Sequence, residues 1–197
     1  MIDFRQIPLQ LHVTEGPAIF NVNLEAEASE DLSEVLSETF DWLAKHFNIQ
    51  RMTAVGHRVV HGDTFSGPVR ITDSMIKAID ALTILAPLQQ PQSLRLIRAI
   101  RQLRPGVTQV ASFDTAFYRT NPDIVRRFAI PRKLHDDGIK RYGFHGLSYK
   151  YIAGELKRRA PESAKGNVVV AHLERTRYCA GAKPRSDGLF RDCVISA

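Results

Sequence analysis

Three residue types that together could neutralise a transferring anion occur along the chain: an arginine, an aspartate and a histidine. Arg58 lies within GHRVVHG, Asp114 follows the apolar run VTQVASF, and His145 lies in the glycine-flanked turn RYGFHGLS. A guanidinium binds a carboxylate or phosphate through two parallel hydrogen bonds, and an imidazole can donate to an oxygen that gains charge. Phosphoryl transfer between anions depends on such groups more than on covalent catalysis. We therefore take these three residues as candidate catalytic residues.

Each of the three also has a purely structural interpretation. A lone arginine in an apolar strand is expensive to bury, so Arg58 could form an internal salt bridge. Asp114 could cap the helix that follows its strand, and an isolated histidine between glycines is usually a turn residue. The residues alone leave both interpretations open.

The elements that would position these residues alternate between strands and helices. The first two dozen residues alternate loosely around Glu15-Gly16-Pro17, which predicts two antiparallel strands. Helical spacing predicts a helix that begins at a Ser29 cap. Further strands are predicted over 52–61, 107–113 and 166–173, and further helices from Asp73 and over 91–103, 122–128 and 146–159. This alternation predicts an α/β fold with a largely parallel sheet.

The three motifs, in their order and spacing, resemble those of the acetate kinase family, and the resemblance runs from about Thr53 to His172. It implies incomplete ribonuclease-H-like lobes of the acetate and sugar kinase, Hsp70 and actin superfamily. On this basis residues 1–115 form part of an N-terminal lobe, 116–173 open a C-terminal lobe, and 174–197 are a divergent tail. The tail shows neither helical nor strand periodicity, as a frame-shifted or an ordinary flexible terminus would.

The resemblance implies a role for each candidate catalytic residue. Arg58 would contact a carboxylate substrate, Asp114 would act as a catalytic carboxylate or orient a ligand, and His145 would stabilise the transferring phosphoryl group. The implied cofactors are ATP and Mg²⁺.

Further residues match binding positions of the family. Three of them would line a small apolar pocket for the substrate's methyl group, and one would contact the nucleotide: Val60, Leu88 and Phe144 for the pocket, and His172 for the nucleotide. Such a pocket separates acetate from propionate weakly, because one methylene is worth only about 1–3 kcal/mol.

Departures from the family pattern accompany these matches. Gln89 stands where a histidine is usual, and Asp63 follows Gly62 where a second glycine is usual. After His172 the chain reads LERT in place of a glycine-rich loop, so glycines that would bring backbone amides close to phosphates are missing there. The family's metal-ligating glutamate has no counterpart, and we assign no metal ligand.

The implied function is ATP-dependent phosphoryl transfer to acetate, which forms acetyl phosphate. Without the phosphate cradle and the metal ligand this chain is expected to be a weak enzyme by itself, because each missing interaction is worth about 3 kcal/mol. The alternative is a non-catalytic remnant that binds carboxylates or associates with an intact kinase subunit. The expected partners are acetate or propionate, ATP or ADP, and a second copy of the chain in a homodimer.

Composition narrows the remaining classes of function. Residues 1–60 hold four Lys or Arg against nine Asp or Glu, and the rest holds twenty-three against twelve. No nucleic-acid motif accompanies this basic excess, so outward-facing helical arginines explain it better than a nucleic-acid surface. The sequence has no apolar run long enough to span a membrane and no signal-peptide pattern at its start. Its two cysteines, Cys179 and Cys193, do not suggest a disulfide framework, and we expect a cytoplasmic protein.

Overall fold

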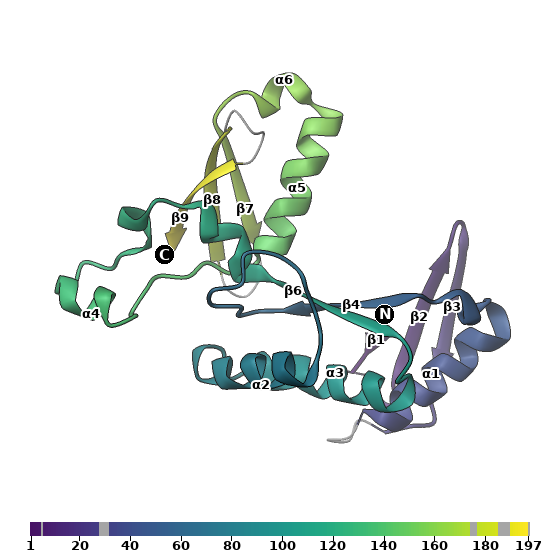
Figure 1. Cartoon of the computed structure of the whole chain (residues 1–197). Helices are drawn as coiled ribbons and strands as arrows, with labels where there is room; N and C mark the ends of the chain where they lie inside the picture. The colour runs from purple at the N-terminus through teal and green to yellow at the C-terminus, as the bar shows by residue number, and fades with distance from the viewer. Residues whose placement is uncertain (5, 28–31, 174–176, 185–189, 197) are drawn as a thin grey trace. The chain divides into compact units, whose positions relative to one another are not determined.

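The computed structural model describes residues 1–4, 6–27, 32–173, 177–184 and 190–196 (Figure 1). Its α-helices are α1 (Ser33–His46), α2 (Asp73–Ala81), α3 (Gln90–Leu103), α4 (Arg132–Asp136), α5 (Gly146–Arg159) and α6 (Pro161–Ala164). Its strands are β1 (Ile2–Asp3), β2 (Gln10–Glu15), β3 (Ala18–Asn23), β4 (Ala54–Val59), β5 (Val69–Arg70), β6 (Thr108–Phe113), β7 (Val168–Leu173), β8 (Arg177–Pro184) and β9 (Phe190–Ser196). Short 3-10 helices are η1 (Ile49–Arg51), η2 (Leu82–Leu85), η3 (Asp114–Thr120) and η4 (Asp123–Arg126).

Two compact units divide the chain. Unit 1 contains Met1–His57, Arg70–Ala81 and Pro87–Val110, and unit 2 contains Arg58–Val69, Leu82–Ala86 and Ala111–Ala197. The units do not coincide with the predicted lobes, because unit 2 also takes residues 58–69, 82–86 and 111–115. The lobe boundary after residue 115 and the separate tail stay predictions.

Unit 1 begins with an antiparallel sheet in the order β1-β2-β3. Gly16 turns the chain between β2 and β3 with a φ of 56°, a left-handed conformation that suits a residue without a Cβ. Apolar residues of this sheet pack with Val35 of α1 in a core that also contains Leu9, Leu11 and Leu24. The predicted pair of N-terminal antiparallel strands is confirmed.

The helices of unit 1 form close to where the sequence places them. α3 packs on α1 through Ala99 and Ile100 against Leu36. α2 begins at Asp73 as expected, but the hydroxyl that caps it belongs to Thr72, which accepts from Met75 N at 3.2 Å. The predicted cap at Ser29 lies outside the described residues.

Strands β4 and β6 position two of the candidate residues and belong to a sheet with the order β4-β6-β5. Arg58 is the last residue but one of β4, and β6 leads directly into Asp114 at the start of η3. Alternate residues of β6 are buried, with Ala111 at 0% and Phe113 at 1% exposure. This period of two fixes the face on which each side chain of the strand lies.

Unit 2 contains the helix predicted over 146–159 and the strand predicted over 166–173, as α5 and β7. Tyr149 of α5 packs with Tyr118 of η3, and Val170 of β7 joins this cluster. Figure 1 shows α5 alongside β7. The observed bounds of α5 are those predicted, 146–159.

Two expectations about strands differ from the structure. The sheets β1-β2-β3 and β7-β8-β9 are antiparallel, whereas the alternation predicted a largely parallel sheet. Successive strands in these sheets follow one another without a helix between them, and a parallel pair would need such a crossover. β8 and β9 form where no strand pattern was found, because their pairing uses backbone groups and needs no side-chain periodicity. The remaining tail residues, 174–176, 185–189 and 197, lie outside the described part of the chain.

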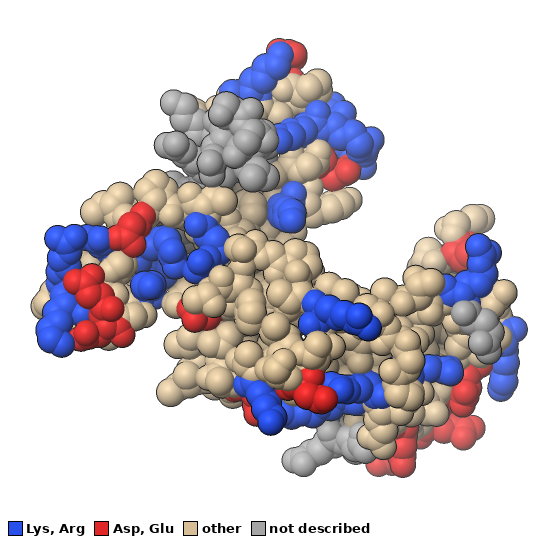
Figure 2. Space-filling view, viewed as in Figure 1, with Lys and Arg blue, Asp and Glu red and all other residues tan. Residues whose placement is uncertain are grey.

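Basic side chains on the surface are mixed with acidic ones. Figure 2 shows Lys and Arg gathered around the end of α5 and around α4, with Asp and Glu among them. Arg158 and Arg159 both pair with Glu155 at 2.7 Å, and Lys133 pairs with Asp137 at 2.8 Å. Among the described residues, no helix has the length and apolar character that crossing a membrane requires.

Candidate active site

The centre of the candidate site is an ion pair between Arg58 and Asp114, both in unit 2. Nη2 and Nε of Arg58 donate to Oδ2 of Asp114 at 2.8 and 3.1 Å. The Asp114 side chain is 1% exposed, whereas the Arg58 side chain is 54% exposed. The pair is therefore anchored in the core at its acidic end and open to solvent at its basic end. This is the salt bridge of the structural interpretation, but an accessible guanidinium can also bind an anion.

The second oxygen of Asp114 is held by the start of α5. Leu147 N donates to Oδ1 at 3.3 Å, so the carboxylate accepts from the first turn of a helix whose free amides favour negative charge. The interpretation of Asp114 as a cap for the helix that follows its own strand is wrong, because η3 has no side-chain cap and Asp114 accepts from α5 instead. With donors on both oxygens, Asp114 is fixed in place and orients Arg58.

The chain enters α5 through an unusual turn at His145 and Gly146. His145 has a φ of 57°, a left-handed conformation that costs a non-glycine residue about 1–3 kcal/mol. Gly146 follows with no room for a side chain, because a Cβ there would overlap the carbonyl oxygen of Asp114 and lie 2.6 Å from Cβ of Phe117. The tight turn places the imidazole beside the ion pair.

The contacts of His145 indicate which of its ring nitrogens is available to donate. Nδ1 lies 3.4 Å from Nη2 of Arg58, a long hydrogen bond. A guanidinium can only donate, so Nδ1 is the acceptor and the ring proton lies on Nε2. The His145 ring also stacks on His172 of β7, with centroids 4.3 Å apart and planes 21° from parallel. An Nε2–H group is the donor that an oxygen of a transferring group requires.

The structure brings four of the sequence-predicted residues together: Arg58, Asp114, His145 and His172. Val60 and Phe144 are partly buried in the same unit, and the carbonyl of Phe144 accepts from the Tyr118 hydroxyl at 2.6 Å. Leu88 belongs to unit 1 and is 80% exposed. The pocket formed by Val60, Leu88 and Phe144 stays a prediction, and so do the roles of all these residues.

A second network, which the sequence analysis did not find, fixes the loop after β4. Asp63 has a left-handed φ of 41°, and its Oδ1 accepts from the Tyr142 hydroxyl at 2.7 Å. His61 packs edge-on against the Tyr142 ring, and its Nδ1 accepts from Asp63 N at 3.2 Å. Burial lowers the pKa of His61 more than nearby Asp63 raises it, so the ring is neutral at neutral pH. The signal for this network was Asp63 itself, a side chain in a position where a glycine is usual.

Loss of the Tyr142 hydroxyl should change how stability depends on pH. Burial first, and then the hydrogen bond to Asp63, raise the pKa of Tyr142 from 10.0 to about 12. The folded protein holds this proton more tightly, so the contribution to stability is complete below pH 10 and is lost as the pH rises from 10 towards 12. Tyr142→Phe should lower the free energy of unfolding by about 1–2 kcal/mol at pH 8, and by less at pH 11.5. Urea unfolding of both proteins measures this, and an equal difference at the two pH values would contradict it.

A resident Mg²⁺ would need several oxygen ligands gathered in one place. Across the described residues, no three His, Cys, Asp or Glu side chains lie together in a group that could hold one. Asp114, the carboxylate closest to the candidate chemistry, already accepts from Arg58 and Leu147. The described residues therefore do not fit a resident Mg²⁺.

Comparisons with known proteins agree with the motifs. A family model described as the Acetokinase family matches residues 14–180. The acetate kinase of Rhodopseudomonas palustris strain TIE-1 is 44% identical over 176 residues, which is 88% of this chain and 44% of that protein. The acetate kinase of Methylocella silvestris is 42% identical over 167 residues, 84% of this chain and 41% of that protein. The chain thus spans less than half the length of these relatives.

Solved structures show the same fold. A propionate kinase from Francisella tularensis superimposes with a TM-score of 0.77 at 33% identity, covering 93% of this chain and 46% of that one. The acetate kinase of Porphyromonas gingivalis gives 0.71 at 30% identity, covering 94% and 47%. The expected fold, that of acetate and propionate kinases in incomplete form, is confirmed.

Proposed function

The chain belongs to the acetokinase family, and from this premise we propose that it carries the carboxylate-binding side of an acetate or propionate phosphotransferase site. The observation that carries the proposal is the meeting of Arg58, Asp114 and His145 within one compact unit. These residues come from β4, from the start of η3 and from the turn before α5. Their convergence provides a cation, a carboxylate that orients this cation, and an imidazole that can donate a hydrogen bond.

Arg58 is the group that binds the substrate carboxylate. Its Nε and Nη2 are directed at Asp114, and more than half of the side chain is accessible to solvent. An incoming carboxylate is therefore bound by a guanidinium that is already oriented, which saves the entropy of ordering a long side chain. Arg58 thus fixes the nucleophile, while Asp114 fixes Arg58.

The proposed reaction moves the terminal phosphoryl group of ATP to the carboxylate. One carboxylate oxygen forms a bond to phosphorus as the bond from phosphorus to the ADP oxygen breaks, so acetate and ATP give acetyl phosphate and ADP. Nε2–H of His145 donates to a phosphoryl oxygen, where charge accumulates. His172, which stacks on His145, limits the rotation of this ring, and by its match to the family it would contact the nucleotide.

Mg²⁺ would accompany the nucleotide and neutralise its phosphate charge. The described residues do not form a site for it, so no step assigned to this chain passes through the metal. Acetate and propionate are both proposed substrates, because they differ by one methylene, which is worth only about 1–3 kcal/mol in a small apolar pocket. A homodimer and a cytoplasmic location remain predictions.

A second candidate function is carboxylate binding without turnover. It is favoured by the absence of a metal-binding group among the described residues and by LERT, which follows His172 without a glycine. The accessible guanidinium of Arg58 would suffice for this function. The two candidates differ only in whether a phosphoryl group moves.

Two measurements on the purified chain separate the candidates. Acetate and propionate should both bind saturably, as followed by NMR, because the guanidinium binds the carboxylate group that both ligands share. Incubation with acetate, ATP and Mg²⁺, with acetyl phosphate trapped as its hydroxamate, should show transfer at well below the roughly 10 per second of an average enzyme. Binding with no transfer would establish the second candidate, and no carboxylate binding at all would overturn both.

A further inference from the structure

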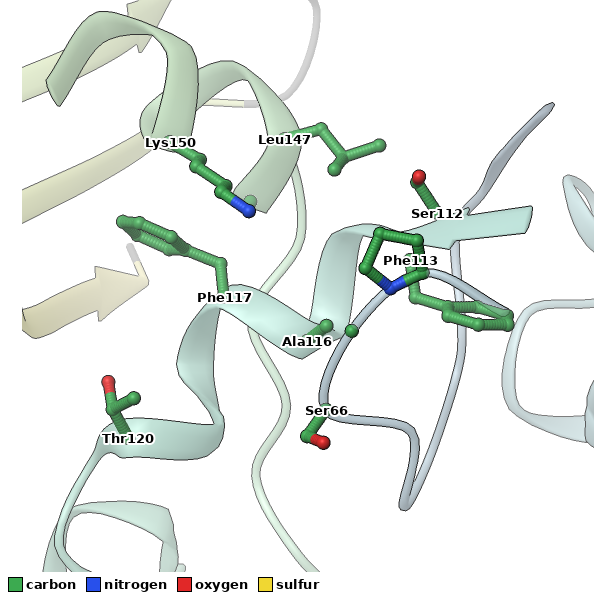
Figure 3. Close-up of a pocket in the computed structure, with 11 residues that line it drawn as sticks. Ser66, Ser112, Phe113, Ala116, Phe117, Thr120, Leu147 and Lys150 are labelled. Atoms are coloured by element: carbon green, nitrogen blue, oxygen red, sulfur yellow. The ribbon is translucent and has the colours of Figure 1, made fainter. Parts of the chain in front are cut away.

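A cavity lined by the end of β6, by η3 and by the start of α5 has no part in the proposed reaction. It has a volume of about 180 Å³ and lies entirely within unit 2. Arg58, Asp114 and His145 do not line it. Its apolar wall includes Phe113, Ala116, Phe117 and Leu147, at the end of β6, in η3 and in the first turn of α5 (Figure 3).

One cation is placed over this apolar wall. Figure 3 shows the Lys150 side chain running from α5 towards η3, with Phe117 on one side and Leu147 on the other. Lys150 makes no ion pair with the residues that the structure describes. The hydroxyls of Ser66 and Ser112 add hydrogen-bonding groups to the lining. The cavity therefore combines an apolar interior with a single positive charge.

We propose that this cavity binds an amphiphilic monocarboxylate with an apolar body of about six carbons, at a site separate from Arg58. The volume supports this size, because an apolar cavity of about 150 Å³ is sufficient for benzene. The charge supports a single anionic group, since Lys150 is the only cation among the lining residues. Acetate fits the electrostatic requirement but leaves the apolar wall uncovered.

The cavity shares structural elements with the candidate active site. Phe113, which is 1% exposed, directly precedes Asp114 in the chain. Leu147 lines the cavity, while its backbone N–H donates to Oδ1 of Asp114. A ligand in the cavity therefore touches the residue whose amide holds the catalytic carboxylate. The NMR signal of the Leu147 amide should therefore report whether a ligand occupies the cavity.

The test titrates the full chain with butanoate, hexanoate and hexanol, and follows the Leu147 amide by NMR. Two added methylenes should make hexanoate bind about 15-fold more tightly than butanoate, because each buried methylene contributes a factor of about four. Lys150→Met should weaken hexanoate binding by about tenfold and leave hexanol binding unchanged. The matched control is Lys157→Met on the same helix, at an exposed position outside the cavity, which should change neither.

The competing outcomes are distinct. Hexanoate should bind equally well in saturating acetate, because the proposed function places acetate at Arg58. Displacement of hexanoate by acetate would show a single site and overturn the second one, as would equal affinities for butanoate and hexanoate. Failure of acetate binding while hexanoate still binds would overturn the proposed function and leave the cavity site standing.

Discussion

Arg58→Met should abolish carboxylate binding and lower the free energy of unfolding by about 2–3 kcal/mol. The Asp114 carboxylate is 1% exposed, and the substitution removes its ionic partner while the apolar length of the side chain is kept. Breaking a fully buried pair costs about 3–5 kcal/mol. The expected loss is smaller here because the guanidinium is half open to water. Chemical denaturation and an acetate titration measure the two effects.

Two control variants test whether the effect comes from the geometry of the guanidinium and from the burial of its partner. Arg58→Lys retains the charge but not the two-pronged donor, so stability should be partly restored while carboxylate affinity stays low. Arg98→Met removes a surface pair with Asp80, in which both side chains are more than half exposed and 3.6 Å apart. This change should cost less than about 1 kcal/mol. If Arg58→Met cost no more than Arg98→Met, the ion pair would not be anchored as the structure indicates.

Gly146→Ala is expected to be the most damaging single methyl addition in the chain's described part. A Cβ at this position overlaps the Asp114 carbonyl oxygen, a backbone atom that cannot move aside as a flexible side chain would. α5 must shift, and the Leu147 amide then leaves Oδ1 of Asp114. A destabilisation of about 3 kcal/mol or more follows, together with loss of carboxylate binding.

The same helix provides a control for this substitution. Gly154 lies in the middle of α5, is exposed, and has nothing within 4 Å of an added Cβ. Gly154→Ala should raise the free energy of unfolding by about 0.5–1 kcal/mol, because alanine is the better helix former. Thermal melts of both variants by circular dichroism should therefore move in opposite directions. A destabilised Gly154→Ala would mean that methyl addition harms α5 for a reason other than the contact at its start.

Much of the site could be predicted because its parts are local in sequence. An apolar run followed by Asp114 marks the end of a buried strand, and the glycines around His145 mark the turn into α5. Helical spacing after that turn gave the bounds 146–159 that the structure has. Matching three ordered motifs then predicted that residues 56 and 31 positions apart would meet, which periodicity alone cannot do.

The rest could not be predicted because it depends on partners far away in the chain. Tyr142 and Asp63 are 79 residues apart, and neither side chain reveals the other in the sequence. The sequence also could not decide which residue caps α2, because Thr72 and Asp73 are neighbours and both are suitable capping residues. Thr72 is the one whose hydroxyl accepts from Met75 N. The cavity beneath Lys150 was also missed, because it requires the spacing between η3 and α5.

The hydrogen bond from the first turn of α5 to Asp114 determines where the chain can tolerate changes of length. The left-handed turn at His145 and the closely packed Gly146 fix where α5 begins, and a helix advances about 1.5 Å per residue, so one residue gained or lost between His145 and Leu147 would displace the Leu147 amide beyond reach of its acceptor. The same insertion after Arg159, where α5 ends, leaves that amide in place. Indels in this chain should therefore be tolerated after α5 and excluded from the turn that begins it.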